Sequence, residues 1–225
     1  MNTVFPNAIS IKELKTDIIR AYADKNIDLS DSIWATSICS DEVNNLFPEF
    51  SHLFAGPGPF TMGGISGLPF TGITGLKAFL SHMPDNGAAM IIYGPHIGYS
   101  SDEEVGFMNR QNQSAKSASC GSLHAALGAL KADATPDENS LDYQQSQVFN
   151  MLNSHKEDIL AADDQLKKAT EVAYESINTT MHQIVDAVRK DLSGIRLYLI
   201  GGIIINTDWQ DDDYFQVHHQ EFYEF

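Results

Sequence analysis

The 225-residue sequence predicts an α/β fold in which helices flank a central sheet. Three short runs, residues 33–39, 88–93 and 195–207, are apolar and β-prone and have the length of buried strands. Segments with the apolar spacing of helices separate these runs, and strands that alternate with helices form a sheet with helices on its faces. The length fits one domain, residues 1–225, with a sizeable core.

The first half of the chain begins with a helix and contains a glycine-rich loop. Residues 9–26 carry apolar side chains at helical spacing, and Ser10 is a candidate N-cap. Residues 41–47 predict a short helix. Seven glycines and three prolines in residues 55–75 predict a long structured loop, whose apolar side chains favour a packed, functional segment. Residues 76–82 predict one or two helical turns.

The second half of the chain is mostly helical before its last strand. Residues 120–131 have a helical pattern, with Ser119 as the candidate cap. Residues 141–190 are polar and helix-prone, which predicts two or three helices with a break near residues 154–155. The strongly apolar, β-branched run at residues 195–207 is the best candidate for a central strand.

The charge of the chain limits its partners. It has 30 acidic and 14 basic residues and a formal net charge of −16 at pH 7. Nucleic acids and anionic membrane surfaces require a basic face, so we expect neither as a partner. No apolar stretch approaches the ~20 residues of a membrane span. The acidic tail, residues 208–225, carries six aromatic side chains, and we expect it to pack on a surface or a partner chain.

Three potential metal ligands lie where elements are expected to begin or end. Cys39 ends a predicted strand, His96 follows another one, and Cys120 opens a predicted helix, whose dipole helps to hold a thiolate. Functional sites in α/β sheets collect beyond the carboxyl ends of the strands. Two thiolates and one imidazole would leave the fourth corner of a zinc tetrahedron to water, which is the catalytic rather than the structural arrangement.

The same residues also have simpler explanations. The only two cysteines of the chain could be core side chains or could form one disulfide, although an isolated pair favours a reducing compartment such as cytoplasm or plastid stroma. His124 lies four residues after Cys120 on the same helical face and is a weaker candidate ligand. His218 and His219 could bind adventitious metal, but surface exposure is the expected state.

Five stretches resemble, in order, the limiting-carbon-dioxide-inducible B/C family, a divergent branch of the β-type carbonic anhydrases that is also called theta. They are CSDEVN (39–44), GGISGLPFTG (63–72), HMPDNG (82–87), GPHIG (94–98) and SCG (119–121). The resemblance implies a β-carbonic-anhydrase-like α/β fold, a homodimer and zinc held by Cys39, His96 and Cys120. It also implies zinc-dependent, reversible hydration of carbon dioxide to bicarbonate.

The resemblance further implies that Asp41 works with an arginine beside the zinc. The ordinary β-type pattern is Cys-x-Asp-x-Arg, and this chain has Val43 at the arginine position. The arginines of the chain are Arg20, Arg110, Arg189 and Arg196. Arg110, which lies between two of the matched stretches without belonging to either, is assigned as the partner of Asp41 by elimination.

The implied chemistry suits these residues. Zinc lowers the pKa of bound water from about 15.7 toward roughly 7 and so makes hydroxide near neutral pH. Asp41 could orient this hydroxide toward the substrate. Phe60, Leu68 and Phe70 could wall a dry slot for carbon dioxide, with plain core packing as the alternative. The alternative function is a catalytically silent, zinc-stabilised protein that acts in an assembly or senses bicarbonate, and the missing arginine at position 43 favours it.

Overall fold

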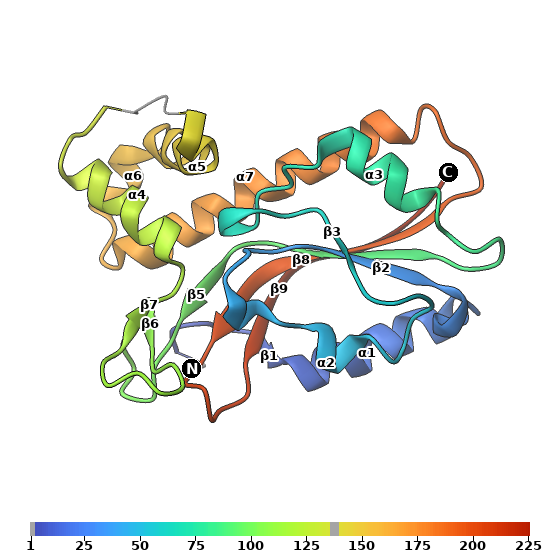
Figure 1. The fold of residues 1–225 in the computed structure, drawn as a ribbon, viewed down its shortest axis with the longest axis horizontal. Coiled ribbons are helices and arrows are strands. Elements are labelled where there is room, and N and C mark those ends of the chain that lie inside the picture. The colour runs from blue at the N-terminus through green and yellow to red at the C-terminus, as the bar shows by residue number, and fades with distance from the viewer. Residues whose placement is uncertain (1–2, 136–139) are drawn as a thin grey trace.

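The computed structural model describes residues 3–135 and 140–225. Its central sheet lies between two layers of helices, so the predicted α/β class is confirmed (Figure 1). Of the described helices, none is both long and apolar enough to cross a membrane.

The central sheet is mostly parallel and has seven strands within the described residues. Its order is β1 (Ala8–Ser10), β9 (Tyr214–Glu224), β8 (Arg196–Asn206), β4 (Ala89–Tyr93), β2 (Ile33–Ser37) and β3 (Phe60–Thr61), and β5 (His96–Gly98) also pairs with β8. Strand β9 is antiparallel to β8, and β1 is antiparallel to β9, whereas the other pairs are parallel. A separate hairpin joins β6 (Phe107–Met108) to β7 (Ser117–Ala118).

Helices cover both faces of the sheet (Figure 1). Helices α1 (Ile11–Asp24) and α2 (Phe47–Phe50) pack on one face. On the other face lie α3 (Gly72–Leu80) and α7 (Gln165–Val188). Helices α4 (Gly121–Lys131), α5 (Tyr143–Asn153) and α6 (Lys156–Ala161) pack beside α7 in the same core. Short 3₁₀ turns are η1 (Leu29–Asp31), η2 (Glu42–Asn44), η3 (Ile65–Gly67) and η4 (Ser140–Asp142).

Strand β4 shows how one sheet supports two hydrophobic cores. Ala89, Ile91 and Tyr93 belong to the core under α3–α7, and Met90 and Ile92 belong to the core under α1 and α2. All five side chains are fully buried. A strand that is covered on both faces loses the polar alternation of an exposed strand, and this explains why the run at residues 88–93 is continuously apolar.

The sequence predicts the N-cap residue of α1 correctly and that of α4 wrongly. Ser10 caps α1 as predicted, because its hydroxyl accepts a hydrogen bond from the Glu13 N–H while the Glu13 carboxylate accepts one from the Ser10 N–H. Helix α4 starts at Gly121, and Cys120 rather than Ser119 occupies its cap position. The Ser119 hydroxyl instead donates to Asn206 Oδ1, so the predicted Ser119 cap is wrong.

The helical region between residues 141 and 190 breaks where the sequence predicts. Helix α5 ends at Asn153 and α6 begins at Lys156. The predicted short helix at residues 41–47 is instead the 3₁₀ turn η2, and α2 begins only at Phe47. The glycine-rich loop is structured, as predicted, and contains β3 and η3.

The tail is more regular than the sequence predicts. Strand β9 is 11 residues long and pairs with β8 from Arg196 to Ile205. The register shifts between Gly201, which faces His219, and Gly202, which faces Val217. His218 is therefore the extra residue of a β-bulge, and this interruption breaks the alternating pattern that would mark residues 214–224 as a strand.

Candidate metal centre

The structure brings the three predicted donors together at one edge of the sheet. Cys39 follows β2, His96 opens β5 just after β4, and Cys120 caps α4. Strands β2 and β4 are parallel neighbours, so their carboxyl ends lie side by side. Cys39, His96 and Cys120 are buried, and one ligand atom from each lies within 4.8 Å of the other two.

The two sulfur atoms have the spacing of zinc ligands. Cys39 Sγ and Cys120 Sγ are 3.8 Å apart, and both thiols are free rather than joined in a disulfide. Two sulfurs bound to zinc at about 2.3 Å in a tetrahedron would be about 3.8 Å apart. The Ser66 N–H also donates to Cys39 Sγ at 3.1 Å, a contact that favours the charged thiolate.

The pair of thiols divides its protons unequally. The hydrogen bond with Cys120, together with burial, raises the pKa of Cys39. The same hydrogen bond lowers the pKa of Cys120 to about 3; burial opposes this shift, and the neighbouring His96 adds to it. These surroundings favour loss of the proton from Cys120, and the thiolate is the form of cysteine that binds a metal.

The imidazole of His96 is oriented for ligation. Its Nδ1–H donates to Asn206 Oδ1 at 2.7 Å, and Ser119 Oγ lies 3.2 Å from the same nitrogen. The lone pair is therefore on Nε2. That atom is buried and has no hydrogen-bond partner among the described residues. A buried polar atom without a partner is costly, and a metal ion would satisfy it, so the donor set fits zinc.

Asp41 lies beside this donor set and is paired with Arg110. Arg110 Nη1 donates to Asp41 Oδ1 at 3.0 Å, and Nη2 donates to Oδ2 at 2.9 Å. Asp41 Oδ2 is 4.0 Å from His96 Nε2. Burial acts to raise the pKa of Asp41, but hydrogen bonds from Arg110 and with Glu42 outweigh it, so the pKa lies below its usual range. The carboxylate is ionised at neutral pH.

Arg110 comes from the β6–β7 hairpin rather than from the segment around Asp41. Its Nε donates to Ser117 Oγ at 2.8 Å, and its Nη1 also contacts Glu42. Val43 has no group that could replace this guanidinium. The contact assigned by elimination is thus present in the fold, while the catalytic roles of Asp41 and Arg110 stay predictions.

The weaker candidate ligand His124 is not part of the donor set. Its Nε2 lies 2.8 Å from the Gly106 carbonyl oxygen, and its ring packs edge-on against Phe107. His218 is exposed and His219 is half-buried on β9.

The three predicted pocket residues pack in the core under α3–α7 or at its margin. The Phe60 ring contacts Phe79 of α3, Leu68 packs against the same core, and the Phe70 ring meets Tyr143 of α5. Their role as a wall for substrate stays a prediction.

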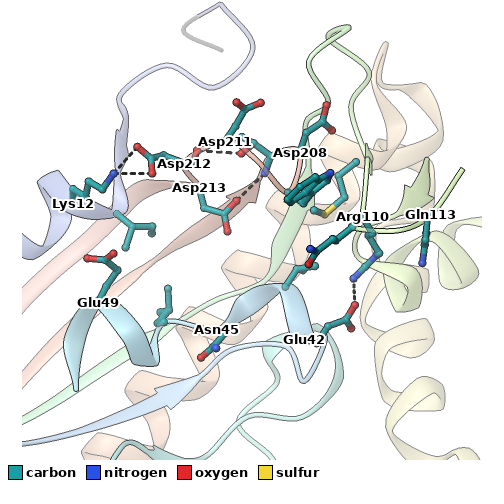
Figure 2. A pocket seen from close by; sticks show the side chains of 17 residues that line it. Lys12, Glu42, Asn45, Glu49, Arg110, Gln113, Asp208, Asp211, Asp212 and Asp213 are labelled. Atoms are coloured by element: carbon teal, nitrogen blue, oxygen red, sulfur yellow. Dashed lines mark hydrogen bonds and ion pairs between the residues drawn. The ribbon is translucent and has the colours of Figure 1, made fainter. Parts of the chain in front are cut away.

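A cavity of about 460 Å³ lies beside Glu42 and Arg110. Figure 2 shows the side chains that line it. Val43 and Arg110 belong to its lining, whereas the three metal donors do not. Its charged side chains are two cations, Lys12 and Arg110, and six carboxylates. A lining with this excess of negative charge disfavours an anion such as bicarbonate, so we do not expect the cavity to serve as the anion pocket of the centre.

Sequence reasoning missed the residues that orient the ligands. Asn206 accepts from the His96 ring and donates through Nδ2 to Asp213 Oδ2 at 3.2 Å. Ser66, from η3, reaches Cys39. One signal could have identified Asn206: it is a polar residue at the end of an otherwise apolar strand, next to the strand end that carries His96.

Solved structures have the same fold. The crystal structure of PtLCIB4, described as a homolog of the limiting CO2-inducible protein LCIB, matches with a TM-score of 0.89 at 30% identity, over 99% of this chain and 94% of that chain. A histidine-to-alanine mutant of PtLCIB4 matches with a TM-score of 0.90 at 30% identity, over 99% of this chain and 92% of the mutant chain. The crystal structure of LCIB matches with a TM-score of 0.73 at 21% identity, over 99% of this chain and 96% of that chain. At this identity the match shows a shared fold. No curated protein sequence matches the chain.

A mostly parallel sheet with helices on both faces, and two thiols and an imidazole gathered at its strand ends, define a β-carbonic-anhydrase-like protein. The chain belongs to the family of limiting CO2-inducible proteins B/C beta carbonic anhydrases, whose family pattern matches residues 8–224. The resemblance read from the five sequence stretches is confirmed.

Proposed function

We propose that this protein is a zinc-dependent carbonic anhydrase that catalyses the reversible hydration of carbon dioxide to bicarbonate. The observation that carries the proposal is the buried Nε2 of His96, which has no hydrogen-bond partner among the described residues. It belongs to the group formed with the two thiols, and the Asp41 carboxylate is 4.0 Å away. Membership in a family described as beta carbonic anhydrases supports it.

Cys39, His96 and Cys120 would hold the zinc ion. Bound zinc supplies a Lewis acid that lowers the pKa of water from about 15.7 toward roughly 7. Asn206 holds the ring of His96 so that Nε2 faces the site, and the Ser66 N–H stabilises the charge on Cys39. Such outer contacts fix the ligand geometry that the chemistry depends on.

Asp41 is the residue that we assign to orient the attacking water. Because its pKa is lowered, it is an acceptor at neutral pH and not a proton donor. A carboxylate has about four lone-pair positions, so it can accept from Arg110 on both oxygens and from one water proton as well. After the water has lost one proton to solvent, its remaining O–H would donate to Asp41 and its oxygen would face the carbon of carbon dioxide. As the new C–O bond forms, the electron pair of one C=O π bond moves onto that oxygen, and the product is bicarbonate.

Arg110 has a positioning role in this proposal. It donates to both carboxylate oxygens of Asp41. These two hydrogen bonds would keep Asp41 from becoming a fourth ligand of the bound zinc. We further propose a homodimer, in line with the resemblance, and an apolar wall for carbon dioxide formed by Phe60, Leu68 and Phe70.

Two measurements on the same protein test the function. Stopped-flow hydration of carbon dioxide by zinc-loaded protein should exceed the rate in buffer, and Cys39→Ser should lose this excess together with one zinc equivalent per chain. A wild type that retains its zinc and gives no acceleration would refute the enzyme and leave the silent, zinc-stabilised protein. A Cys39→Ser variant that keeps full zinc would refute the ligand set.

A further inference from the structure

A second group of potential metal ligands lies between α7 and β9. His182 belongs to α7, and His219 and Glu221 belong to β9. One ligand atom from each lies within 4.8 Å of the other two, and the group shares no residue with the centre at Cys39. His219 Nε2 is 3.7 Å from Glu221 Oε2, and the rings of His182 and His219 meet edge to face with centroids 4.7 Å apart.

The β-bulge in β9 creates this arrangement. In a regular strand, consecutive side chains point to opposite faces. Here both members of the His218–His219 pair contact α7: His218 stacks on Tyr174 at a centroid distance of 4.6 Å, and His219 meets His182. The extra residue in the register turns His219 toward the helix. Glu221 follows two residues later, on the same face as His219.

Both imidazoles have a nitrogen available for a cation. The Nδ1–H of His182 donates to the Asn178 carbonyl oxygen at 2.8 Å, which leaves the lone pair on Nε2. His219 Nε2 is buried and has no hydrogen-bond partner among the described residues. An imidazole that is fixed by a backbone carbonyl through one nitrogen and open at the other is the usual state of a metal ligand.

The charges around the group agree with ligation. Burial lowers the pKa of His219, the neighbouring His182 lowers it further, and Glu221 acts in the opposite direction. The Tyr223 hydroxyl donates to Glu221 Oε2 at 2.9 Å and orients the carboxylate. The side chains of His219 and Glu221 are 22% and 52% exposed, so a cation can enter from solvent.

We propose that His182, His219 and Glu221 form a second metal site, which binds a zinc-like divalent transition-metal cation and links α7 to the last strand of the sheet. Two imidazoles and one carboxylate suit zinc and its first-row neighbours. Calcium and magnesium require more oxygen ligands than this group supplies. Because the ligands come from a helix and a strand, the bound cation crosslinks two elements and stabilises the folded state by mass action.

The zinc content of matched variants tests the site. Wild type, His182→Gln, His219→Gln and His218→Gln are equilibrated by dialysis against the same low free Zn²⁺, and zinc per chain is measured by elemental analysis. His218→Gln is the control, because it removes a histidine from the same bulge that stacks on Tyr174 and lies outside the ligand group. We expect His182→Gln and His219→Gln to hold one equivalent less than wild type, and His218→Gln to match wild type.

The outcomes separate this site from the proposed catalytic centre. If the site at Cys39 bound no zinc, the zinc content of all four proteins would fall by the same amount. The difference in zinc content between wild type and the His182 and His219 variants would remain. Equal zinc in all four proteins, or the same loss in His218→Gln as in His219→Gln, would overturn the second site.

If the variants fail to fold, an NMR titration of the wild-type protein still tests the site. In imidazole NMR spectra of wild type, Zn²⁺ should shift the ring signals of His182 and His219 and leave exposed His155 unchanged, while Mg²⁺ should shift none of them. Unshifted signals of His182 and His219 at saturating Zn²⁺ would also overturn the proposal.

Discussion

Arg110 donates two hydrogen bonds to the two carboxylate oxygens of Asp41, although the residues are 69 positions apart in the sequence. The side chains are only 13% and 14% exposed. A bidentate, largely buried pair is stronger and more directional than a surface ion pair. The guanidinium that the β-type pattern would place at position 43 is thus provided by the β6–β7 hairpin, at the same carboxylate.

Asp41→Asn should retain zinc and lose activity. The amide keeps the size of the side chain but replaces one acceptor oxygen with a donor, so the attacking water is no longer oriented. We expect the hydration rate to fall by on the order of 10²-fold or more. Stopped-flow hydration, with zinc content measured in parallel, checks this, and an unchanged rate would remove Asp41 from the mechanism.

The double variant tests whether Arg110 acts through Asp41. If Arg110 only positions the carboxylate, then Arg110→Ala should lower activity, and Asp41→Asn with Arg110→Ala should be little worse than either single variant. Arg189→Ala is the control, since Arg189 pairs with Asp186 at an exposed site. Strict additivity of the two losses would show that Arg110 acts independently of Asp41.

Asn206→Leu should weaken zinc binding without removing a ligand. Asn206 Oδ1 accepts from the Nδ1–H of His96, and losing such an outer contact usually costs about 10–100-fold in metal affinity. Competition with a colorimetric chelator measures the affinity. Equal affinities for wild type and Asn206→Leu would contradict the positioning role.

Asp208 should make stability depend on pH. Burial acts to raise its pKa, but hydrogen bonds from Asn109 and Ser101 outweigh burial and lower it to about 2. A pKa lowered on folding adds stability above the unfolded-state value, and this stability is lost as the pH falls from about 4 toward about 2. A shift of this size is on the order of 2 kcal/mol.

Urea unfolding of wild type and Asp208→Asn measures the contribution of the Asp208 carboxylate to the free energy of unfolding. Wild type should be more stable by roughly that amount at pH 7, and the difference should shrink toward pH 3. A difference that is constant over this range would show that the Asp208 carboxylate carries no such linkage.

Two glycine substitutions should have opposite effects. Gly94 has a φ of +143°, and a Cβ there would lie 1.7 Å from the Gly202 carbonyl oxygen. Gly94→Ala should therefore destabilise the protein by at least about 2 kcal/mol. Gly128, in α4, has open space around it, so Gly128→Ala should stabilise by up to about 1 kcal/mol through helix propensity. Thermal unfolding measures the stability of both variants. A Gly94→Ala variant as stable as wild type would contradict the close approach of Gly94 to Gly202.

Light scattering tests the proposed homodimer. Trp209 is 51% exposed on this chain, and an exposed aromatic side chain in the tail fits an interface between copies. We expect the mass of two chains at dilute concentration. A mass of one chain that persists as concentration rises would contradict the proposal.

The elements that the sequence predicts well are those whose signal is local. The run at residues 88–93 is continuously apolar and the run at 33–39 mostly so, because both faces of their strands are buried. The ends of these runs, and with them Cys39 and His96, can therefore be located without a structure. The break near residues 154–155 is local in the same way.

The features that the sequence does not reveal depend on long-range contacts. Strand β9 is hidden because the bulge at His218 interrupts its alternation, and only pairing with β8 defines it. Ser119 resembles a cap, but a bond to Asn206, 87 positions away, redirects its hydroxyl. Arg110 could be assigned only by elimination, since nothing near it in sequence marks its approach to Asp41.

The pairing of β1 with β9 places the first and last strands of the described residues side by side. During synthesis, Cys39, His96 and Cys120 are made long before Asn206, whose amide orients the histidine, and before the strand that borders β8. Contacts that close nearly the whole chain form late, because their loop entropy must be overcome first. The oriented set of two thiols and one imidazole is therefore a property of the folded protein, and a growing chain on the ribosome has these side chains without their geometry.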